Sequence, residues 1–241
     1  MENKQALRII RETKTIYNTI AKDWDASRFR PSPLKIALLK SVKRGGRTLD
    51  LGCGNGFMAK TVLARGGRYF GLDTSSKLIA LAKKRNKSLI KNKSAKFVVG
   101  DALRLPYKDN FFDFIFSFAV LHHIPSEEKR LKFFSEMRRV LKPAGSAVLI
   151  NWNLLNDWSR KKFKIAEQLK NPEAGFDPGD ARVPWKGTKG KSFRRFLHIF
   201  SAGELKRLAK TAGFKSCLVE YRLRGGQNKK NAEEQVVKLK K

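Results

Sequence analysis

The chain of 241 residues is long enough for one sizeable core, and its 41% hydrophobic and 10% aromatic content excludes an intrinsically disordered protein. Its 53 basic residues outnumber 21 acidic ones, and this net charge of +32 predicts attraction to polyanions, nucleic acid first. No apolar run reaches the roughly 18–20 residues of a membrane span, and the N-terminus lacks a signal-peptide pattern. Cys53 and Cys217 are too few for a disulfide framework or a metal site. We therefore expect a reduced cytoplasmic protein with no membrane or metal partner.

The positive charge is spread almost evenly along the chain, so it identifies no single binding face. The densest run, residues 83–93, carries six basic and no acidic residues. Such a run is usually a solvated helix face, with phosphate contact as the alternative. Charge alone therefore favours a nucleic-acid partner without locating its site.

The N-terminal residues 1–46 predict two helices before the first strand. Apolar side chains recur near helical spacing in residues 1–24 and again in residues 34–42. Residues 27–33 interrupt the pattern with two prolines, and Gly45-Gly46 ends the second helix. Arg28 lies in that interruption, ahead of the first predicted strand, so we interpret residues 1–46 as a helical lid; the alternative is that Arg28 is ordinary surface charge.

Residues 48–56 read Thr-Leu-Asp-Leu-Gly-Cys-Gly-Asn-Gly and predict a buried strand, a tight turn and the start of a helix. Glycines let the backbone turn sharply and approach a ligand, and a helix N-terminus presents free N–H groups. We therefore expect Asp50, Gly52, Cys53 and Gly54 to form the floor of a small-molecule site.

Two kinds of cofactor fit this turn. Residues 54–59 match the dinucleotide fingerprint G-x-G-x-x-A, with Asp73 as an acid downstream. However, Asp50 would repel a pyrophosphate, whereas a cationic aminoacyl tail tolerates that charge. The whole pattern, an acid followed by three alternate glycines, resembles the first motif of class I S-adenosylmethionine-dependent methyltransferases, which implies S-adenosyl-L-methionine as the cofactor.

Two further carboxylates end the next predicted strands. Asp73 ends residues 68–73, beside the glycine turn in a doubly wound sheet, where it would accept both ribose hydroxyls. The alternative is an Asp that caps the following helix. Asp101 ends the strand that starts at residue 96. The family resemblance implies that Asp101 reaches the adenine amino group and that the N–H of Ala102 reaches the ring.

Residues 111–120 are apolar on both faces, as expected of a central parallel strand. His122 and His123 follow it, and neighbouring histidines rarely bind one metal together, so we expect no metal site. One of the two is expected to line the donor pocket. Residues 127–141 predict a helix, and residues 146–152 predict the fifth strand.

The character of the sequence changes after Trp152. Residues 157–169 predict a basic helix, and residues 171–191 are too long for a plain connector, so they form either a functional lid or a mobile segment. Trp185 lies there among cations, a pattern typical of single-stranded RNA binding. The alternative is that Trp185 packs onto the core.

The C-terminal residues 201–241 predict a capped helix that ends at Gly213 and a closing hairpin joined through Gly225-Gly226. We therefore predict an α/β fold: a Rossmann-like class I methyltransferase with a doubly wound, mostly parallel sheet, a C-terminal antiparallel hairpin and helices on both faces. Its expected parts are the lid over residues 1–46, an S-adenosylmethionine-binding core over residues 47–152, a basic substrate-side insertion over residues 153–200, and residues 201–241, which complete the same domain.

Over nearly its full length the chain resembles the methyltransferases that esterify the carboxymethyl group of the wobble uridine in tRNA. The segments that carry the resemblance are residues 17–21, 27–33, 117–123, 183–185 and 195–205. The last two lie outside the donor motifs, so they discriminate among methyltransferases. The sequence departs from the family near its end, where the aromatic-rich last strand is replaced by Asn231-Ala-Glu-Glu-Gln.

The resemblance implies tRNA as substrate and a small zinc-binding activator protein as partner. A carboxylate nucleophile is already ionised at neutral pH, so alignment and exclusion of water, rather than a general base, supply the rate. No catalytic residue is certain on this interpretation. The candidate roles are substrate positioning by Arg28, His122 and Arg195, pocket shaping by Trp152, Trp185 and His198, and cofactor binding by Ser117 and His122 in addition to the residues above.

Other functions remain open at this stage. A small-molecule methyltransferase of the same fold, acting on a quinone-like or carboxylate metabolite, would be active without RNA. A non-catalytic RNA-binding relative would fail to bind the donor. A dehydrogenase would bind a nicotinamide cofactor instead.

Overall fold

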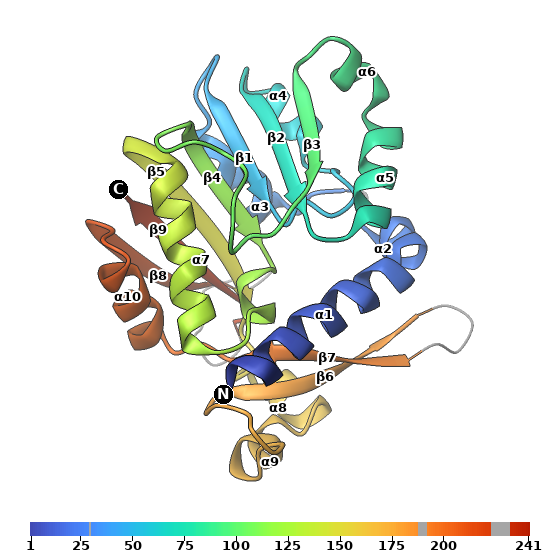
Figure 1. The fold of residues 1–241 in the computed structure, drawn as a ribbon, viewed down its shortest axis with the longest axis vertical. Coiled ribbons are helices and arrows are strands. Elements are labelled where there is room, and N and C mark those ends of the chain that lie inside the picture. The colour runs from blue at the N-terminus through green and yellow to red at the C-terminus, as the bar shows by residue number, and fades with distance from the viewer. Residues whose placement is uncertain (29, 188–191, 223–231) are drawn as a thin grey trace.

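A central sheet organises the computed structural model, which describes residues 1–28, 30–187, 192–222 and 232–241 (Figure 1). In these residues the sheet has seven strands in the order β3–β2–β1–β4–β5–β9–β8. Strands β1 to β5 pair in parallel, and β9 pairs antiparallel with both β5 and β8. The strand bounds are β1 Arg47–Leu51, β2 Arg68–Asp73, β3 Ala95–Val99, β4 Phe112–Phe118, β5 Leu141–Trp152, β8 Ser216–Arg222 and β9 Glu234–Lys240. The predicted doubly wound sheet with a closing hairpin is confirmed; the predicted turn at Gly225-Gly226 lies outside the described residues.

Helices cover both faces of this sheet. One face packs against α7 and α10 through a cluster that includes Phe133, Met137 and Leu205, and the other packs against η1, α4 and α5 through Leu39, Val62 and other apolar residues. The bounds of the helices up to the fifth strand are α1 Asn3–Thr19, α2 Ala21–Ser27, α3 Pro33–Leu38, η1 Leu39–Ser41, α4 Ala59–Leu63, α5 Ser76–Arg85, α6 Lys87–Lys91, η2 Leu121–His123 and α7 Glu127–Val140. After that strand come α8 Asp157–Lys162, α9 Ile165–Lys170 and α10 Ala202–Thr211.

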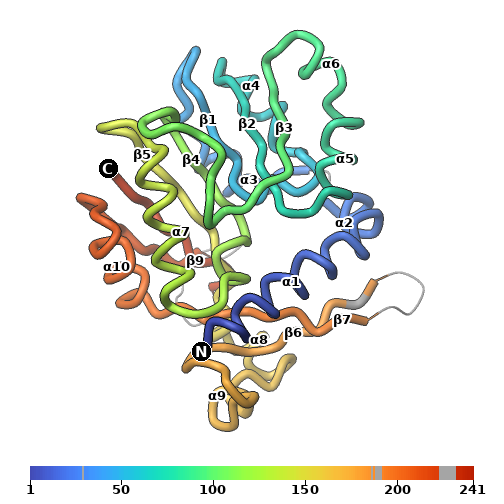
Figure 2. The backbone as a smooth tube through the Cα atoms, in the orientation of Figure 1, coloured from blue at the N-terminus to red at the C-terminus, as the bar shows by residue number. Residues whose placement is uncertain are grey.

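The first helix crosses below the carboxyl ends of the parallel strands (Figure 2). It packs against α5 of the core and against β7 (Ser192–His198) of a separate hairpin. The side chain of Asn18 on α1 accepts hydrogen bonds from the Ser75 hydroxyl, at 2.8 Å, and from the Lys77 N–H, at 3.2 Å. Residues predicted as a lid therefore lie at the sheet edge where α/β proteins bind their ligands.

The segment after β5 differs from the prediction. Instead of one helix to residue 169, α8 ends before Lys164, which takes a left-handed conformation with φ of 50°, and α9 follows. Of the predicted lid or mobile segment, residues 188–191 lie outside the described residues, and residues 180–186 form β6 (Asp180–Lys186), which pairs antiparallel with β7. A small apolar cluster, including Leu154, Ile165 and Val183, packs these elements together. We propose that these elements form an insertion that begins near residue 153.

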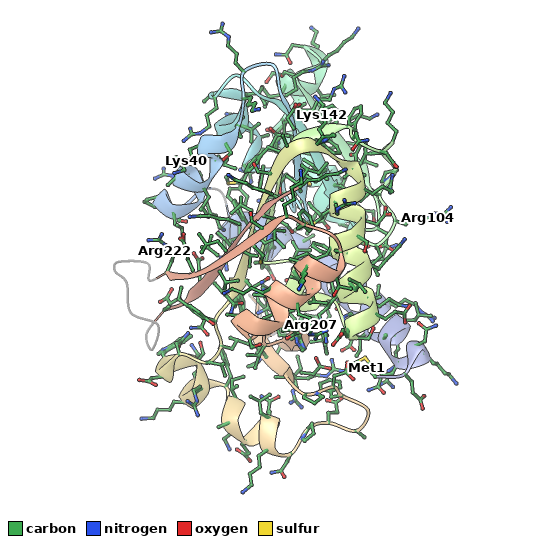
Figure 3. The ribbon with its side chains drawn as sticks, turned by 90° about the vertical axis from the view of Figure 1, so that its left-hand side faces the viewer. Met1, Lys40, Arg104, Lys142, Arg207 and Arg222 are labelled. Carbon is green, nitrogen blue, oxygen red and sulfur yellow. The ribbon has the colours of Figure 1, made fainter. Side chains whose placement is uncertain are left out.

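Basic side chains come from many elements of the fold. The labelled ones in Figure 3 come from η1 (Lys40), the connection after β3 (Arg104), β5 (Lys142), α10 (Arg207) and β8 (Arg222). This agrees with the even spread of charge in the sequence. Within the described ranges, no helix is long and apolar enough to cross a bilayer, and no group of three or more His, Cys, Asp or Glu is placed to hold a metal ion.

Candidate active site

A cavity lies where the strand order reverses, at the carboxyl ends of β1 to β4. Its floor is the glycine turn after β1, and α1 and α2 contribute Ile10, Tyr17 and Trp24 to its wall. Of the predicted residues, the cavity lining includes Asp50, Gly52, Cys53, Gly54, Asp73, Asp101, Ala102, Arg28 and Trp152. The sheet edge thus joins most of the predicted cofactor residues with two of the predicted substrate residues.

The glycine turn is tightly constrained. Gly52 has φ of +81°, and a Cβ added there would lie 2.2 Å from Cγ2 of Val120. The N–H groups of Gly52 and Cys53 both donate to the carbonyl oxygen of Leu72, at 2.7 and 3.0 Å. Gly54 has φ of +54°, and its N–H donates to Oδ2 of Asp73 at 2.8 Å. These bonds fix the turn to the end of β2.

Two carboxyl groups of the floor are buried or held by main chain. Asp50 is 3% exposed and accepts a 2.6 Å hydrogen bond from the Tyr69 hydroxyl. Burial raises the pKa of Asp50 to about 7, although the Tyr69 hydrogen bond acts to lower it. Burial also raises the pKa of Asp73, against the lowering effect of the N–H groups of Ser75 and Gly54. Asp73 is not the N-cap of α5, since the hydroxyl of Ser75 accepts from the Leu78 N–H.

The third predicted carboxylate, Asp101, is exposed and accepts a 2.9 Å hydrogen bond from the N–H of Leu103. Asp50, Asp73 and Asp101 come from the ends of three neighbouring strands, and all three line the cavity. A glycine floor that a Cβ would fill, with carboxylates for a cationic tail and for hydroxyl donors, fits the methyl donor predicted from the sequence.

An aromatic wall faces this floor. The Tyr17 hydroxyl lies 2.8 Å from Nε2 of His123, whose Nδ1 lies 2.9 Å from the carbonyl oxygen of Phe196. Because a carbonyl only accepts, Nδ1 carries the proton, and Tyr17 donates to Nε2. Burial, and next the charge of Arg195, lower the pKa of His123 to about 3, so its imidazole is neutral.

Arg195 lies behind that wall rather than on it. It is 4% exposed, its Nη1 donates to the Tyr17 hydroxyl at 3.4 Å, and its guanidinium carbon lies 5.1 Å from the ring centroid of Trp152. Its Nε has no partner among the described residues, and none of their carboxylates forms an ion pair with it. The wall is therefore backed by a buried positive charge that lacks a counterion in this part of the chain.

Three other predicted residues do not line the cavity. The Ser117 hydroxyl donates to the carbonyl oxygen of Leu51 at 2.8 Å, which ties β4 to β1. His122 is buried, which holds its pKa well below the ordinary value, and its ring lies 5.4 Å from that of Trp152, centroid to centroid. Trp185 is half-buried on the hairpin, with its ring centroid 6.4 Å from that of Phe193.

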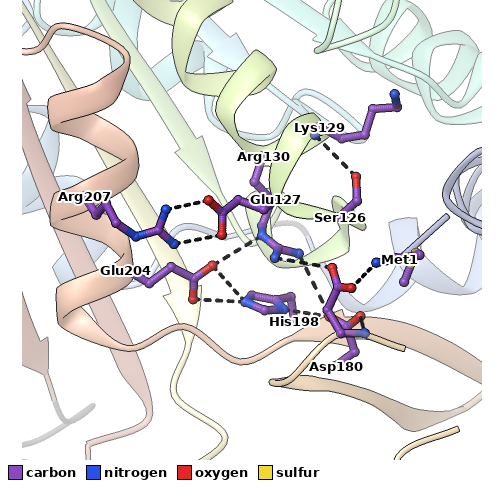
Figure 4. Close-up of polar contacts among 10 residues, drawn as sticks. Met1, Ser126, Glu127, Lys129, Arg130, Asp180, His198, Glu204 and Arg207 are labelled. Carbon is purple, nitrogen blue, oxygen red and sulfur yellow. Dashed lines mark hydrogen bonds and ion pairs between the residues drawn. The ribbon is translucent and has the colours of Figure 1, made fainter. Parts of the chain in front are cut away.

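His198 lies in a charged network away from the cavity (Figure 4). Its Nδ1 lies 2.6 Å from Oδ1 of Asp180, and its Nε2 lies 3.0 Å from Oε2 of Glu204. Burial lowers the pKa of His198, but these two hydrogen bonds more than offset that and raise it. Nε of Arg130 on α7 lies 3.4 Å from Oε1 of Glu204. The position predicted to shape the substrate pocket thus joins β6, β7, α7 and α10.

Sequence reasoning missed several residues that line the cavity: Ile10, Thr13, Tyr17, Trp24, Lys35 and His123. The first three were detectable, because spacings of three and four place them on one face of a helix. The choice between His122 and His123 was not, since adjacent residues of the short helix η2 point to different neighbours.

Comparisons with known proteins agree with this fold. A model of the methyltransferase domain family matches residues 49–149. The tRNA (carboxymethyluridine(34)-5-O)-methyltransferase of Schizosaccharomyces pombe is 31% identical over 217 residues, which are 82% of this chain and 86% of that protein. A Methanosarcina mazei protein described as a SAM-dependent methyltransferase is 24% identical, with a TM-score of 0.67 over 88% of this chain and 98% of that one.

The same fold occurs in a solved complex between the Haloferax volcanii Trm112 methyltransferase activator and a methyltransferase, with 16% identity and a TM-score of 0.65 over 93% of this chain and 96% of that one. Fold, domain match and site together define a methyltransferase of the Rossmann-like class. The chain belongs to the family of the tRNA (carboxymethyluridine(34)-5-O)-methyltransferases.

Proposed function

We propose that this protein transfers a methyl group from S-adenosyl-L-methionine to the carboxylate of a carboxymethyluridine at the wobble position of tRNA. The observation that carries the proposal is one cavity whose floor has the glycine turn and carboxylates of a donor site and whose wall is backed by the unneutralised cation of Arg195. An anionic acceptor suits that wall, and the 31% identical relative is named for this reaction.

The bound donor would supply an electrophilic methyl group on its sulfonium. Asp73 and Asp101 would bind the adenosine, and Asp50 would face the cationic tail. The positive charge of Arg195 would attract the acceptor carboxylate across Tyr17, whose one O–H is donated to His123, because a charge in a water-poor site acts more strongly than in water. His123, neutral and hydrogen-bonded on both nitrogens, orients Tyr17 and takes no proton from the acceptor.

Arg28→Ala should lower turnover and leave donor binding intact. Arg28 lines the cavity from the residue after α2, with its guanidinium carbon 4.9 Å from the ring centroid of Trp24. An exposed cation in the cavity lining is suited to steering an anionic acceptor. We expect kcat/KM to fall up to about fivefold, because one exposed charge contact contributes at most about 1 kcal/mol. Steady-state kinetics with RNA measures kcat/KM, and a binding titration measures the affinity for the donor. If donor affinity falls as much as kcat/KM does, Arg28 is a structural residue.

Donor affinity should rise with pH through about 7. The pKa of Asp50 is raised to about 7, so below that pH its carboxyl is mostly neutral and above it negative. A cationic tail favours the negative form, and donor binding should therefore tighten until about pH 8 and then level off. The dissociation constant of the donor, measured at a series of pH values from about 5.5 to 8.5, tests this dependence. In Asp50→Asn the rise around neutral pH should be flattened; an unchanged profile would exclude Asp50 as its source.

We also propose a small zinc-binding activator as partner, on the edge strand β3. That strand is unpaired on its outer side in the described sheet, and Val99 on it is 46% exposed. Gly100 and Asp101, which follow directly, line the cavity. A partner strand added to this edge would cover Val99 and stabilise the adenosine side of the site.

We further propose that the protein is cytoplasmic. The thiols of Cys53 and Cys217 are free, as is usual in a reducing compartment.

The deciding experiment is transfer of labelled methyl from S-adenosylmethionine to total tRNA that carries carboxymethyluridine, followed by nucleoside analysis. The expected product is the methyl ester of the wobble nucleoside. The assay is repeated with a candidate zinc-binding activator added. Donor binding without transfer to tRNA in either case would overturn the tRNA proposal and favour a small-molecule acceptor, and failure to bind the donor would exclude methyl transfer altogether.

A further inference from the structure

Trp158 is the most exposed large hydrophobic side chain in the described part of the chain, at 62%. It lies on α8, beyond the cavity, and Leu155, three residues earlier, is 43% exposed. Neither residue belongs to the apolar cluster beneath α8 and α9. An indole this exposed contributes little to the packing of the fold, so its position calls for another role.

Cations surround this indole. Lys161 and Lys162 follow Trp158 at spacings of three and four, which places all three on one helix face. The Nζ of Lys162 lies 4.3 Å from the indole centroid. Among the described residues no carboxylate forms an ion pair with Arg160, Lys161 or Lys162. The face thus combines an exposed aromatic surface with positive charge that no described side chain neutralises.

The exposed ring is fixed from below. The buried side chain of Asn156 caps α8 by accepting the N–H of Ser159 at 2.8 Å. Phe163 packs edge-on against the indole, with centroids 5.7 Å apart and planes at 83°. Leu154 and Ile165, on either side of the helix, are buried in the apolar cluster. A ring held this way loses little conformational entropy on binding.

We propose that Trp158, Lys161 and Lys162 form an RNA-binding platform, on which an unpaired base stacks on the indole in place of the Lys162 ammonium while both lysines contact the flanking phosphates. This inference rests on the proposed tRNA substrate. Aromatic rings among cations are the common means of holding single-stranded RNA. Trp152, which lines the cavity, precedes Trp158 by six residues, so the two Cα atoms lie within roughly 22 Å. That distance is short enough for the stacked base and the methylated nucleotide to belong to one RNA loop.

A membrane is the poorer occupant. The helix has six residues and only Trp158 and Leu155 as exposed apolar side chains nearby, whereas interfacial helices bury a continuous apolar face. A stacked base needs only one ring and its neighbouring charges. One indole flanked by two lysines therefore matches a nucleotide better than a lipid surface.

The test is binding of a fluorescently labelled anticodon stem-loop RNA to the full chain without donor. Trp158→Ala should weaken binding roughly 5- to 150-fold, the range found for one stacked base. Trp158→Phe should retain most of the affinity, because a phenyl ring also stacks. In the double variant Lys161→Glu with Lys162→Glu, the plot of log affinity against log salt concentration should become less steep, by about 1.4. Each phosphate that a cation neutralises contributes about 0.7 to the steepness of that plot. Circular dichroism and donor titration should be unchanged in all variants.

A charge-matched control is Lys83→Glu with Lys84→Glu on α5, where both lysines are at least partly exposed. It should weaken RNA binding less than the pair on α8 does. Full RNA affinity in Trp158→Ala, or equal effects from the two lysine pairs, would overturn the platform. If Trp158→Ala keeps its RNA affinity but binds phosphatidylglycerol vesicles more weakly than wild type, the surface is a membrane-binding site and the platform is also overturned.

The platform and the proposed function fail differently. If wild-type protein binds the stem-loop through Trp158 but methylates no tRNA, the platform stands and the substrate proposal fails. If tRNA is methylated with the same KM by wild type and Trp158→Ala, the substrate proposal stands and the platform fails.

Discussion

Gly52→Ala should abolish donor binding and destabilise the fold. The new Cβ would lie 2.2 Å from Cγ2 of Val120, and φ of +81° is unfavourable for any residue with a Cβ. Overpacking costs about 1–3 kcal/mol, and the left-handed conformation adds about 1 kcal/mol. Any relief must move Gly52 or Val120, and both line the cavity. Donor titration and thermal unfolding measure the two effects.

Gly203→Ala is the matched control. Gly203 lies inside α10, and a Cβ there would meet only the Ser201 hydroxyl oxygen, at 3.8 Å. Alanine is favoured over glycine within a helix by about 1 kcal/mol, so this variant should be slightly more stable and bind the donor normally. Normal donor binding by Gly52→Ala would show that the turn does not form the floor of the donor site.

Arg195→Met should lower methyl transfer by about tenfold while the protein stays as stable as wild type or becomes more stable. The residue is 4% exposed and has no counterion among the described residues, so the burial of its charge opposes folding. Methionine fills much of the same volume without charge. The decrease is smaller than for loss of a donor that touches the reacting group, because Arg195 acts on the acceptor across Tyr17. The measurements are kcat, KM for RNA, donor affinity and Tm.

Arg182→Met on the neighbouring strand provides the contrast. Arg182 is also buried, at 9% exposure, but it pairs with Glu12 at 2.7 Å and with Glu173 at 3.2 Å. Its replacement should lower stability by about 1 kcal/mol, because both partners are partly exposed, with little specific effect on the chemistry. If Arg195→Met were destabilised like Arg182→Met and kept its kcat, Arg195 would be a structural residue.

The core of the fold was predictable because its signals are local. Each of β1, β2 and β3 is a short apolar run that ends in or just before an acid or a glycine turn, and parallel strands bring those ends to one edge. The donor floor follows from that rule, which needs no knowledge of side-chain packing. Asp50, Asp73 and Asp101 were therefore placed on the cavity without a structure.

The acceptor side was less predictable because its contacts are distant in sequence. Strand β6 depends on pairing with β7, and its arginine and proline argue against a strand when read alone. His198 was predicted to be a pocket residue because no neighbouring sequence pattern indicates its contacts with Asp180 and Glu204. Arg195 was predicted to position the substrate, but its place one layer behind Tyr17 depends on how α1 packs on the hairpin.

The even distribution of basic side chains has a consequence for how RNA meets this protein. A charged patch on one side would turn an approaching polyanion toward it, whereas basic residues spread over many elements also attract RNA in wrong orientations. Long-range attraction here raises the frequency of encounters without selecting the productive one. Selection falls to short-range contacts after collision, and a bound RNA would have to reorient on the surface before its target nucleotide enters the cavity.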